Sequence, residues 1–190
     1  MALAVSVPIL EDQHILEKFK QPDSRRYAFN LLVRKYQERV YYLVRKMVID
    51  HEDADDLVQE TFIRVWNNLD KFQGDAQLFT WIYRIATNEC LRFLKKKRRR
   101  FFVPIGDIAH ELAQKVETSP WIDGDEIQKK LQKALLGLPD KQRLVFNLRY
   151  FEAMKYEAIA DVTGTSVGAL KASYHLAVKK VEAYLQNEAL

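Results

Sequence analysis

Apolar residues return every three or four positions through most of this chain, and this repeat constrains the fold more than any other feature. One stripe contains Leu31, Leu32, Tyr36, Val40, Leu43, Val44 and Met47. Another contains Leu57, Phe62, Val65, Trp66 and Leu69. The period is typical of amphipathic helices that bury one face. Only six Gly and five Pro occur among 190 residues, so turns are sparse and the sequence predicts an all-α protein.

The helical spacing is lost in one internal segment, residues 101–125. Its turn-forming residues are Pro104, Gly106, Ser119, Pro120 and Gly124. We interpret this segment as a linker that contains a short helix through 108–116. Helical spacing then resumes, with Ile127, Leu131, Leu135 and Leu138 on one face. The sequence therefore predicts two small helical domains, 10–100 and 126–190, joined by the linker.

Charge and composition narrow the classes of function. The net charge is +4, with acidic residues gathered in 51–56 and basic ones in 95–100, which predicts different partners for different faces. A single Cys excludes an internal disulfide, and four scattered His do not form a zinc pattern. The apolar residues 1–10 are too short for a membrane span and lack the basic start of a signal peptide, so we expect a cytoplasmic protein.

No nucleophile with its base and no complete ligand set can be recognised along the chain. The acidic cluster His51, Asp53, Asp55 and Asp56 lacks a second cluster that would complete a metal site. The sequence therefore predicts a protein that is not an enzyme, with no cofactor and no metal. An enzyme such as an acidic-cluster metal hydrolase is the weakest alternative.

The segment 79–100 reads FTWIYRIATNECLRFLKKKRRR and divides into two helical faces. The predicted buried face contains Phe79, Ile82, Ile85, Ala86, Cys90, Phe93 and Leu94. The opposite face contains Trp81, Arg84, Asn88, Arg92 and Lys95, with Thr80 and Thr87 beside it. Bases stack on aromatic rings, cations bind phosphates and an amide can bind a base edge, so this mixture favours nucleic acid. A basic solvated helix end, a membrane-surface helix and a localisation signal remain alternatives.

Residues 156–185 have the pattern of a helix-turn-helix. Gly164 permits the turn, and Ser166 can cap the second helix. Early exposed residues of such a second helix meet base edges. We therefore expect Lys171 and His175 to contact DNA, with Thr165 and Ser166 near its backbone. An ordinary helical hairpin with solvated lysines is the alternative.

Polar residues line one side of the helix predicted through 53–72. These are Asp56, Gln59, Glu60 and Asn67, with Ile63 as the apolar member. Such a face suits a partner helix that carries Arg and Lys, although the pattern alone favours a solvated surface.

Three motifs in order resemble the bacterial extracytoplasmic-function sigma factors. They read DADDLVQETFIRVW, FTWIYRIATNECLRFLKKKRR and LPDKQRLVFNLRYFEAMKYEAIADVTGTSVGALKASY, and the resemblance spans about 14–185. It implies a sigma factor that binds core RNA polymerase and directs initiation at specific promoters. The first domain would recognise and melt the minus-ten element, and the helix-turn-helix would read the minus-35 element.

The resemblance also assigns residues to three surfaces. For the polymerase beta-prime coiled coil these are Asp53, Asp56, Gln59, Glu60 and Ile63. For minus-ten DNA they are Gly74, Asp75, Ala76, Gln77, Trp81, Arg84, Asn88, Arg92 and Lys95, the first four belonging to a loop that captures a flipped base. For minus-35 DNA they are Thr165, Ser166, Gly168, Lys171, Ala172, His175 and Lys179.

Other implied partners are the polymerase beta flap and a membrane-linked anti-sigma factor, which the residues themselves do not require. No stable homo-oligomer is expected. The chain departs from the family at Lys155, Thr87, Ala169, Ser173 and Leu176, which leaves its promoter sequence open because base discrimination depends on such side chains. A stand-alone dimeric helix-turn-helix regulator is the alternative function; it would leave the Trp81 face unused.

Overall fold

A computed structural model describes residues 11–101, 112–114, 116 and 126–187 of the chain. All regular secondary structure in these residues is helical, which confirms the predicted all-α class. Most of the predicted linker lies outside the described residues. Within it, residues 112–114 and 116 are helical, in agreement with part of the short helix predicted through 108–116.

The first helical group consists of α1 (Asp12–Phe19), α2 (Arg25–Val48), α3 (His51–Asn68) and α4 (Leu78–Phe101), with 3-10 turns at Pro22–Ser24 and Leu69–Lys71. The chain reverses between α2 and α3 at Ile49, which is buried and has a φ of 65°. The next residue, Asp50, caps α3: its carboxylate accepts the backbone N–H of Asp53 across 3.1 Å. Acidic residues in the first turn of α3 are further stabilised by the helix dipole.

The predicted stripes form the core of this group. All seven stripe residues of α2 are buried, and Val40, Leu43, Val44 and Met47 have no exposed surface. From α3, Leu57, Phe62 and Val65 are buried, and Trp66 meets the rings of Phe19 and Phe29 at 5.4 and 4.9 Å between centroids. These edge-on contacts attach α1 to α2 and α3.

The second helical group consists of α6 (Glu126–Leu136), α7 (Asp140–Phe146), a π-helical segment Asn147–Phe151, α8 (Tyr156–Thr163) and α9 (Val167–Asn187). Gly164 ends α8 with a φ of 67°, and the Ser166 hydroxyl accepts the backbone N–H of Ala169 across 3.4 Å. The predicted helix-turn-helix is therefore present. Ile127 has the spacing of the apolar face of α6 and is 74% exposed, whereas Leu135 and Leu138, which share that spacing, are buried.

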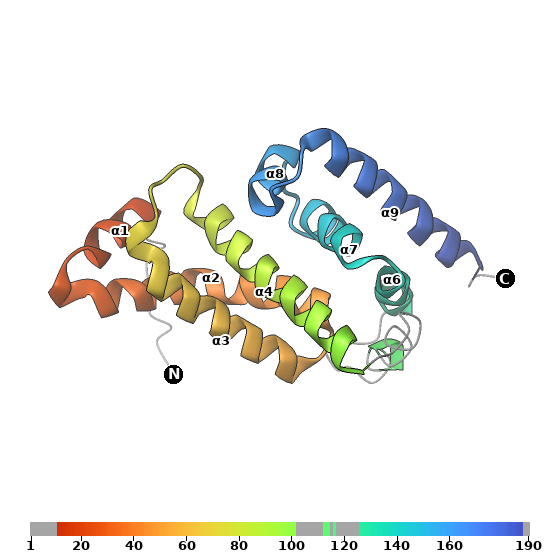
Figure 1. The fold of residues 1–190 in the computed structure, drawn as a ribbon, viewed down its shortest axis with the longest axis horizontal. Helices are drawn as coiled ribbons and strands as arrows, with labels where there is room; N and C mark the ends of the chain where they lie inside the picture. The colour runs from red at the N-terminus through yellow and green to blue at the C-terminus, as the bar shows by residue number, and fades with distance from the viewer. Residues whose placement is uncertain (1–10, 102–111, 115, 117–125, 188–190) are drawn as a thin grey trace, which may run out of the picture.

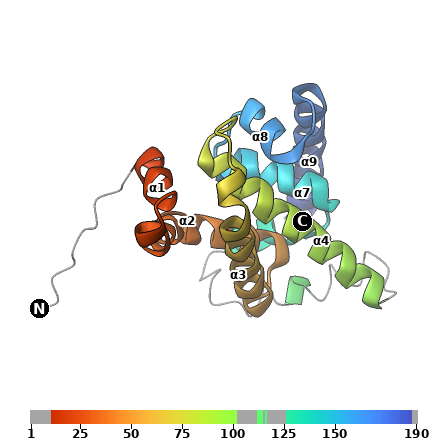
Figure 2. The ribbon, with the colours of Figure 1, turned by 60° about the vertical axis from the view of Figure 1, so that its left-hand side comes forward.

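The two groups pack directly on each other (Figures 1 and 2), with α8 beside α4 and α7 beside both α2 and α4. One hydrophobic core continues from the first group into Leu144, Leu148, Ile159 and Val162 of the second. Figure 1 shows α9 on the outer side of the second group, away from α3. None of the described helices is apolar over a stretch that could span a bilayer.

Candidate nucleic-acid interface

The mixed face predicted for α4 is present, with one adjustment. Arg84, Asn88, Arg92 and Lys95 are exposed, and Trp81 is half-buried. Ile82, Ala86 and Cys90 on the opposite face are fully buried. Thr80 and Thr87, which the sequence places beside this face, are only 4% and 2% exposed, because α4 is covered on both flanks by neighbouring helices.

The outward face of α4 borders a hollow of about 260 Å³ that it shares with the end of α3. Trp81, Asn88 and Arg92 line it from α4. The other side is supplied by Arg64, Asn68 and Lys71, which the sequence analysis did not single out. The hollow is thus rimmed by cations and amides with one aromatic ring at its end.

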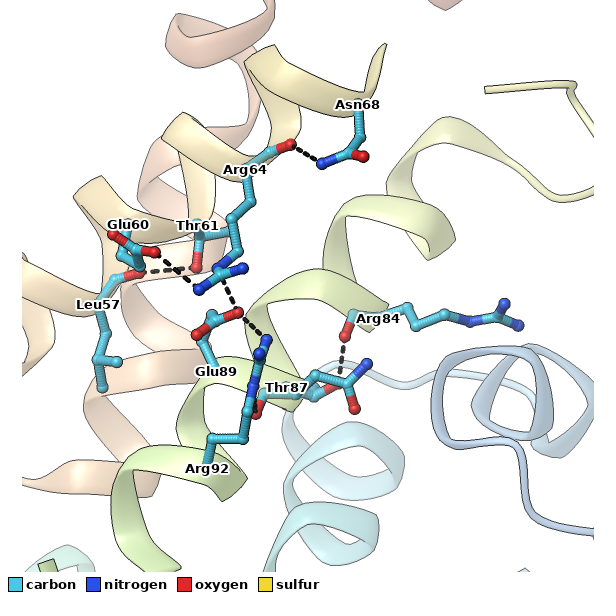
Figure 3. Close-up of polar contacts among 10 residues, drawn as sticks. Leu57, Glu60, Thr61, Arg64, Asn68, Arg84, Thr87, Glu89 and Arg92 are labelled. Atoms are coloured by element: carbon cyan, nitrogen blue, oxygen red, sulfur yellow. Dashed lines mark hydrogen bonds and ion pairs between the residues drawn. The ribbon is translucent and has the colours of Figure 1, made fainter. Parts of the chain in front are cut away.

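A buried carboxylate fixes two of these cations. Glu89 is 6% exposed, and its Oε1 lies 2.6 Å from Nε of Arg64 in an ion pair that joins α4 to α3. The guanidinium of Arg92 pairs with the same oxygen. Figure 3 shows both guanidinium groups converging on Glu89, and Arg64 also reaches Glu60 at 2.9 Å. The sequence signals for this arrangement are the spacing of three between Glu89 and Arg92 and the spacing of four between Glu60 and Arg64.

The loop before α4 forms a second hollow, of about 330 Å³, with Trp81 at its edge. Asp75 and Ala76 line it from the loop, and the ring of Phe72 lies 5.3 Å from that of Trp81. Gly74 has a φ of 83° and turns the loop there. The structure therefore brings Asp75 and Ala76 next to Trp81, whereas Gly74 and Gln77 do not line this hollow.

Arg84 closes the second hollow together with a residue of the second group. Its Nε donates to the backbone carbonyl oxygen of Asp161 in α8 across 2.7 Å, and its NH2 group donates to the same oxygen. In Figure 3, Arg84 points away from the Glu89 cluster, toward the second group. Arg84, which the sequence predicts to contact DNA, thus binds the first helix of the helix-turn-helix.

The predicted polymerase face on α3 is divided between solvent and internal contacts. Asp56, Gln59 and Ile63 are exposed, and Ile63 is 54% exposed in spite of its apolar side chain. Glu60 is half-buried beside Arg64. Asp53 instead faces α4, where its carboxylate binds Nζ of Lys97 at 2.8 Å.

The predicted DNA face of the helix-turn-helix is open. Its exposed members are Thr165, Ser166, Gly168, Lys171, Ala172, His175 and Lys179. Buried Leu170, Ala177 and Val181 hold α9 to the second group from the other side. Leu176 is 49% exposed on the outward face, although its side chain is apolar. Cationic groups thus border a surface that contains an uncovered leucine.

Comparison with known proteins gives two family matches and close full-length relatives. Residues 32–100 match Sigma-70 region 2, which covers all of α3 and most of α2 and α4. Residues 128–181 match Sigma-70, region 4. The chain is 33% identical to RNA polymerase sigma-H factor of Pseudomonas aeruginosa, over 93% of this chain and 94% of the relative. It is 30% identical to ECF RNA polymerase sigma-E factor of Escherichia coli K12, over 93% and 95%.

Two solved structures share the fold. CnrH in complex with the cytosolic domain of CnrY matches with a TM-score of 0.67 at 24% identity, over 93% of this chain and 97% of that one. The sigma factor RpoE in complex with the anti-sigma factor NepR, from Bartonella quintana, matches with a TM-score of 0.65 at 21% identity, over 83% and 96%. The arrangement of both helical groups is therefore one that has been observed before.

Proposed function

We propose that the two helical groups divide promoter recognition between them, since this chain belongs to the extracytoplasmic-function sigma factors of bacterial RNA polymerase. As a member of this family it directs promoter-specific transcription initiation. In the proposal, domain 10–100 binds core polymerase and melts the minus-ten element. Domain 126–190 reads the minus-35 element, and 101–125 links them. The observation that carries the division is the match of region 2 to the helices that bear the Trp81 face.

The hollow beside Trp81 suits a base that has left the duplex. Extruding a base costs a few kcal/mol of lost pairing and stacking, which new stacking and hydrogen bonds must offset. The Trp81 ring can stack on a base, and Asp75 and Gln73 supply polar groups at the same hollow. We assign base capture to this loop together with Trp81.

Strand attraction is assigned to the cations that follow on α4. Arg92 and Lys95 continue the outward face along the helix axis beyond Asn88. Lys and Arg on such a face bind phosphates and release counterions, so this contribution weakens with salt. Arg84 joins this set only after it leaves the Asp161 carbonyl oxygen.

The exposed polar side of α3 is assigned to the polymerase. Asp56 and Gln59 surround Ile63, and an exposed apolar residue inside a polar rim is the usual anatomy of an interface. The resemblance identifies the beta-prime coiled coil as the partner here and the beta flap as that of the second domain. Asp53 is less suited than the other four residues, since Lys97 already neutralises it.

Regulation by an anti-sigma factor completes the proposal. The two structural neighbours were solved with the anti-sigma factor NepR and with the cytosolic domain of CnrY. By extension, the partner of the present chain would be a membrane-linked anti-sigma factor. The chain itself would act in the cytoplasm and would not be an enzyme. A stand-alone dimeric regulator would use α8 and α9 alone and gives no role to the region 2 match.

Transcription in vitro with core RNA polymerase and a library of genomic promoters tests the proposal. The chain should start transcription at a subset of promoters, and an inability to start at any of them would overturn the function. The double variant Asp56→Lys with Glu60→Lys should abolish core binding and keep the helix content. Glu38→Lys, an exposed glutamate on α2, is the matched control and should bind normally.

A further inference from the structure

An apolar strip lies within the DNA face of α9. Ala172 and Leu176 are four positions apart, so their side chains point to the same side of the helix. Both are exposed, and Leu176 is the larger of the two. Lys171, His175 and Lys179 flank them. The strip therefore lies beside a row of polar side chains that includes two lysines.

Most other large apolar side chains on the described surface have a contact or a role that accounts for them. Tyr150 is 57% exposed but stacks on Phe146 with centroids 5.2 Å apart. Ile63 lies on the proposed polymerase face. A single exposed leucine is common on protein surfaces, and what distinguishes Leu176 is its place on a helix that would enter the major groove, between side chains suited to phosphates.

The neighbouring lysine leaves the strip accessible. Nζ of Lys171 lies 5.8 Å from the centroid of the Tyr156 ring, so the ammonium group is drawn toward α8. Lys171 is therefore positioned at the side of α9, where the phosphate backbone would pass. Ala172 and Leu176 remain exposed on the neighbouring part of the α9 surface, where the bases would lie.

We propose that Ala172 and Leu176 read thymine methyl groups in the upstream promoter element; this rests on the proposed function of the helix-turn-helix. The C5-methyl group of thymine is the apolar group that a major groove presents to a side chain. Four residues of helix rise about 6 Å, close to two base steps of about 3.4 Å each. The element of this chain should therefore contain thymines about two base steps apart, on either strand.

The test uses the holoenzyme, because each DNA-binding domain alone is expected to bind weakly. Transcription from a promoter library randomised at the upstream element first identifies the preferred sequence. Each thymine of that sequence is then replaced by deoxyuridine, which removes only the methyl group. Replacement at a contacted thymine should lower initiation about four-fold, the value of one buried methyl group.

Variants of Leu176 test whether this side chain is the one that contacts the thymine methyl group. Leu176→Ala should lower initiation from the preferred element about ten-fold, as a lost apolar base contact does, and should make initiation insensitive to deoxyuridine at one thymine. Leu176→Met should retain most of the sensitivity. Gln186→Ala, an exposed position at the far end of α9, is the control and should behave as the parent chain.

The outcomes separate this contact from the function it rests on. Failure to select any initiating promoter would overturn the proposed function itself. A selected element without thymines, or one in which deoxyuridine has no effect on the parent chain, would overturn the thymine contact alone. Equal sensitivity in the parent chain and in Leu176→Ala would overturn the role of Leu176.

Discussion

The Tyr83 hydroxyl donates a hydrogen bond to the Glu152 carboxylate across 2.8 Å, and this bond joins α4 to the segment before α8. Tyr83 is fully buried, and the side chain of Glu152 is 10% exposed. Burial first, and then the charge of Glu152, raise the pKa of Tyr83, so the hydroxyl keeps its proton. Lys46 places its ammonium 3.7 Å from the same carboxylate. The two helical groups therefore share a buried polar contact as well as an apolar core.

Removing this bond should weaken the association of the groups. Tyr83→Phe and Glu152→Gln should each lower the free energy of unfolding, and a double-mutant cycle should give a coupling of about 1.5 to 3 kcal/mol, as for hydrogen bonds to charged groups. Urea unfolding measures it. Glu182→Gln changes an exposed carboxylate of α9, outside its first turn, and should leave stability unchanged. Additive effects of the two substitutions would show that the bond contributes little.

The two glutamates that bind Arg64 should differ strongly in their contribution to stability. Glu89→Gln leaves two guanidinium groups beside a buried neutral amide and should cost about 3 kcal/mol. Glu60 meets Arg64 at the surface, where its side chain is 46% exposed. Glu60→Gln should therefore cost less than about 1 kcal/mol. Chemical unfolding of both variants gives the comparison, and equal losses would contradict the importance of burial.

Ile63 should contribute to polymerase binding without contributing to the fold. Ile63→Ala removes an exposed side chain, so the thermal unfolding temperature should stay within about a degree or two, because surface substitutions are usually within about 0.5 kcal/mol. The affinity for core polymerase should fall about ten-fold if the isoleucine is buried there. Competition binding measures this. Tyr27→Ala, an equally exposed apolar position on α2, should leave the affinity unaltered.

The buried thiol of Cys90 should make stability depend on alkaline pH. Burial raises its pKa from 9.0 to about 12. The unfolded chain then loses a proton that the folded chain retains, so the contribution of this group is complete below about pH 9 and is lost as pH rises toward about 12. Over that interval the free energy of unfolding should fall less steeply in Cys90→Ala than in the parent, by up to about 1.4 kcal/mol per pH unit.

Thiol labelling provides an independent check on Cys90. A disulfide reagent at about pH 8 should react with the unfolded chain and only slowly with the folded one, because a protonated, buried thiol is a poor nucleophile. Rapid labelling of the folded chain would show that α4 is far more accessible than its packing indicates.

Sequence reasoning succeeded where the helical period alone decides the outcome. On α4 it separated Ile82 and Cys90 from Arg84 and Asn88 because side chains half a turn apart face opposite ways. It did not indicate that Thr87 is buried or that Ile127 is exposed, because the burial of both depends on which helices pack nearby rather than on spacing. The assignment of named residues to polymerase and to the two promoter elements stays a prediction.

Contacts between distant parts of the chain had no local signal. Nothing in the sequence near Glu152 indicates that it meets Tyr83, and nothing near Arg84 indicates that it binds the Asp161 carbonyl oxygen. Both contacts depend on how the two groups dock, which a single sequence does not encode in its period. The cap at Asp50 could have been found, since Asp is a preferred residue immediately before a helix.

The packing of α8 on α4 has a thermodynamic consequence for recruitment by polymerase. Elements named for positions ten and 35 lie about 25 base pairs apart, or ~85 Å of duplex at ~3.4 Å per base pair, whereas the two groups touch in this structure. Engaging both elements therefore requires the groups to part. The apparent dissociation constant for core polymerase should equal the dissociation constant of the separated form divided by the fraction of molecules whose groups are separated. The free energy with which the two groups associate therefore sets the concentration of free polymerase that a cell needs before the factor responds.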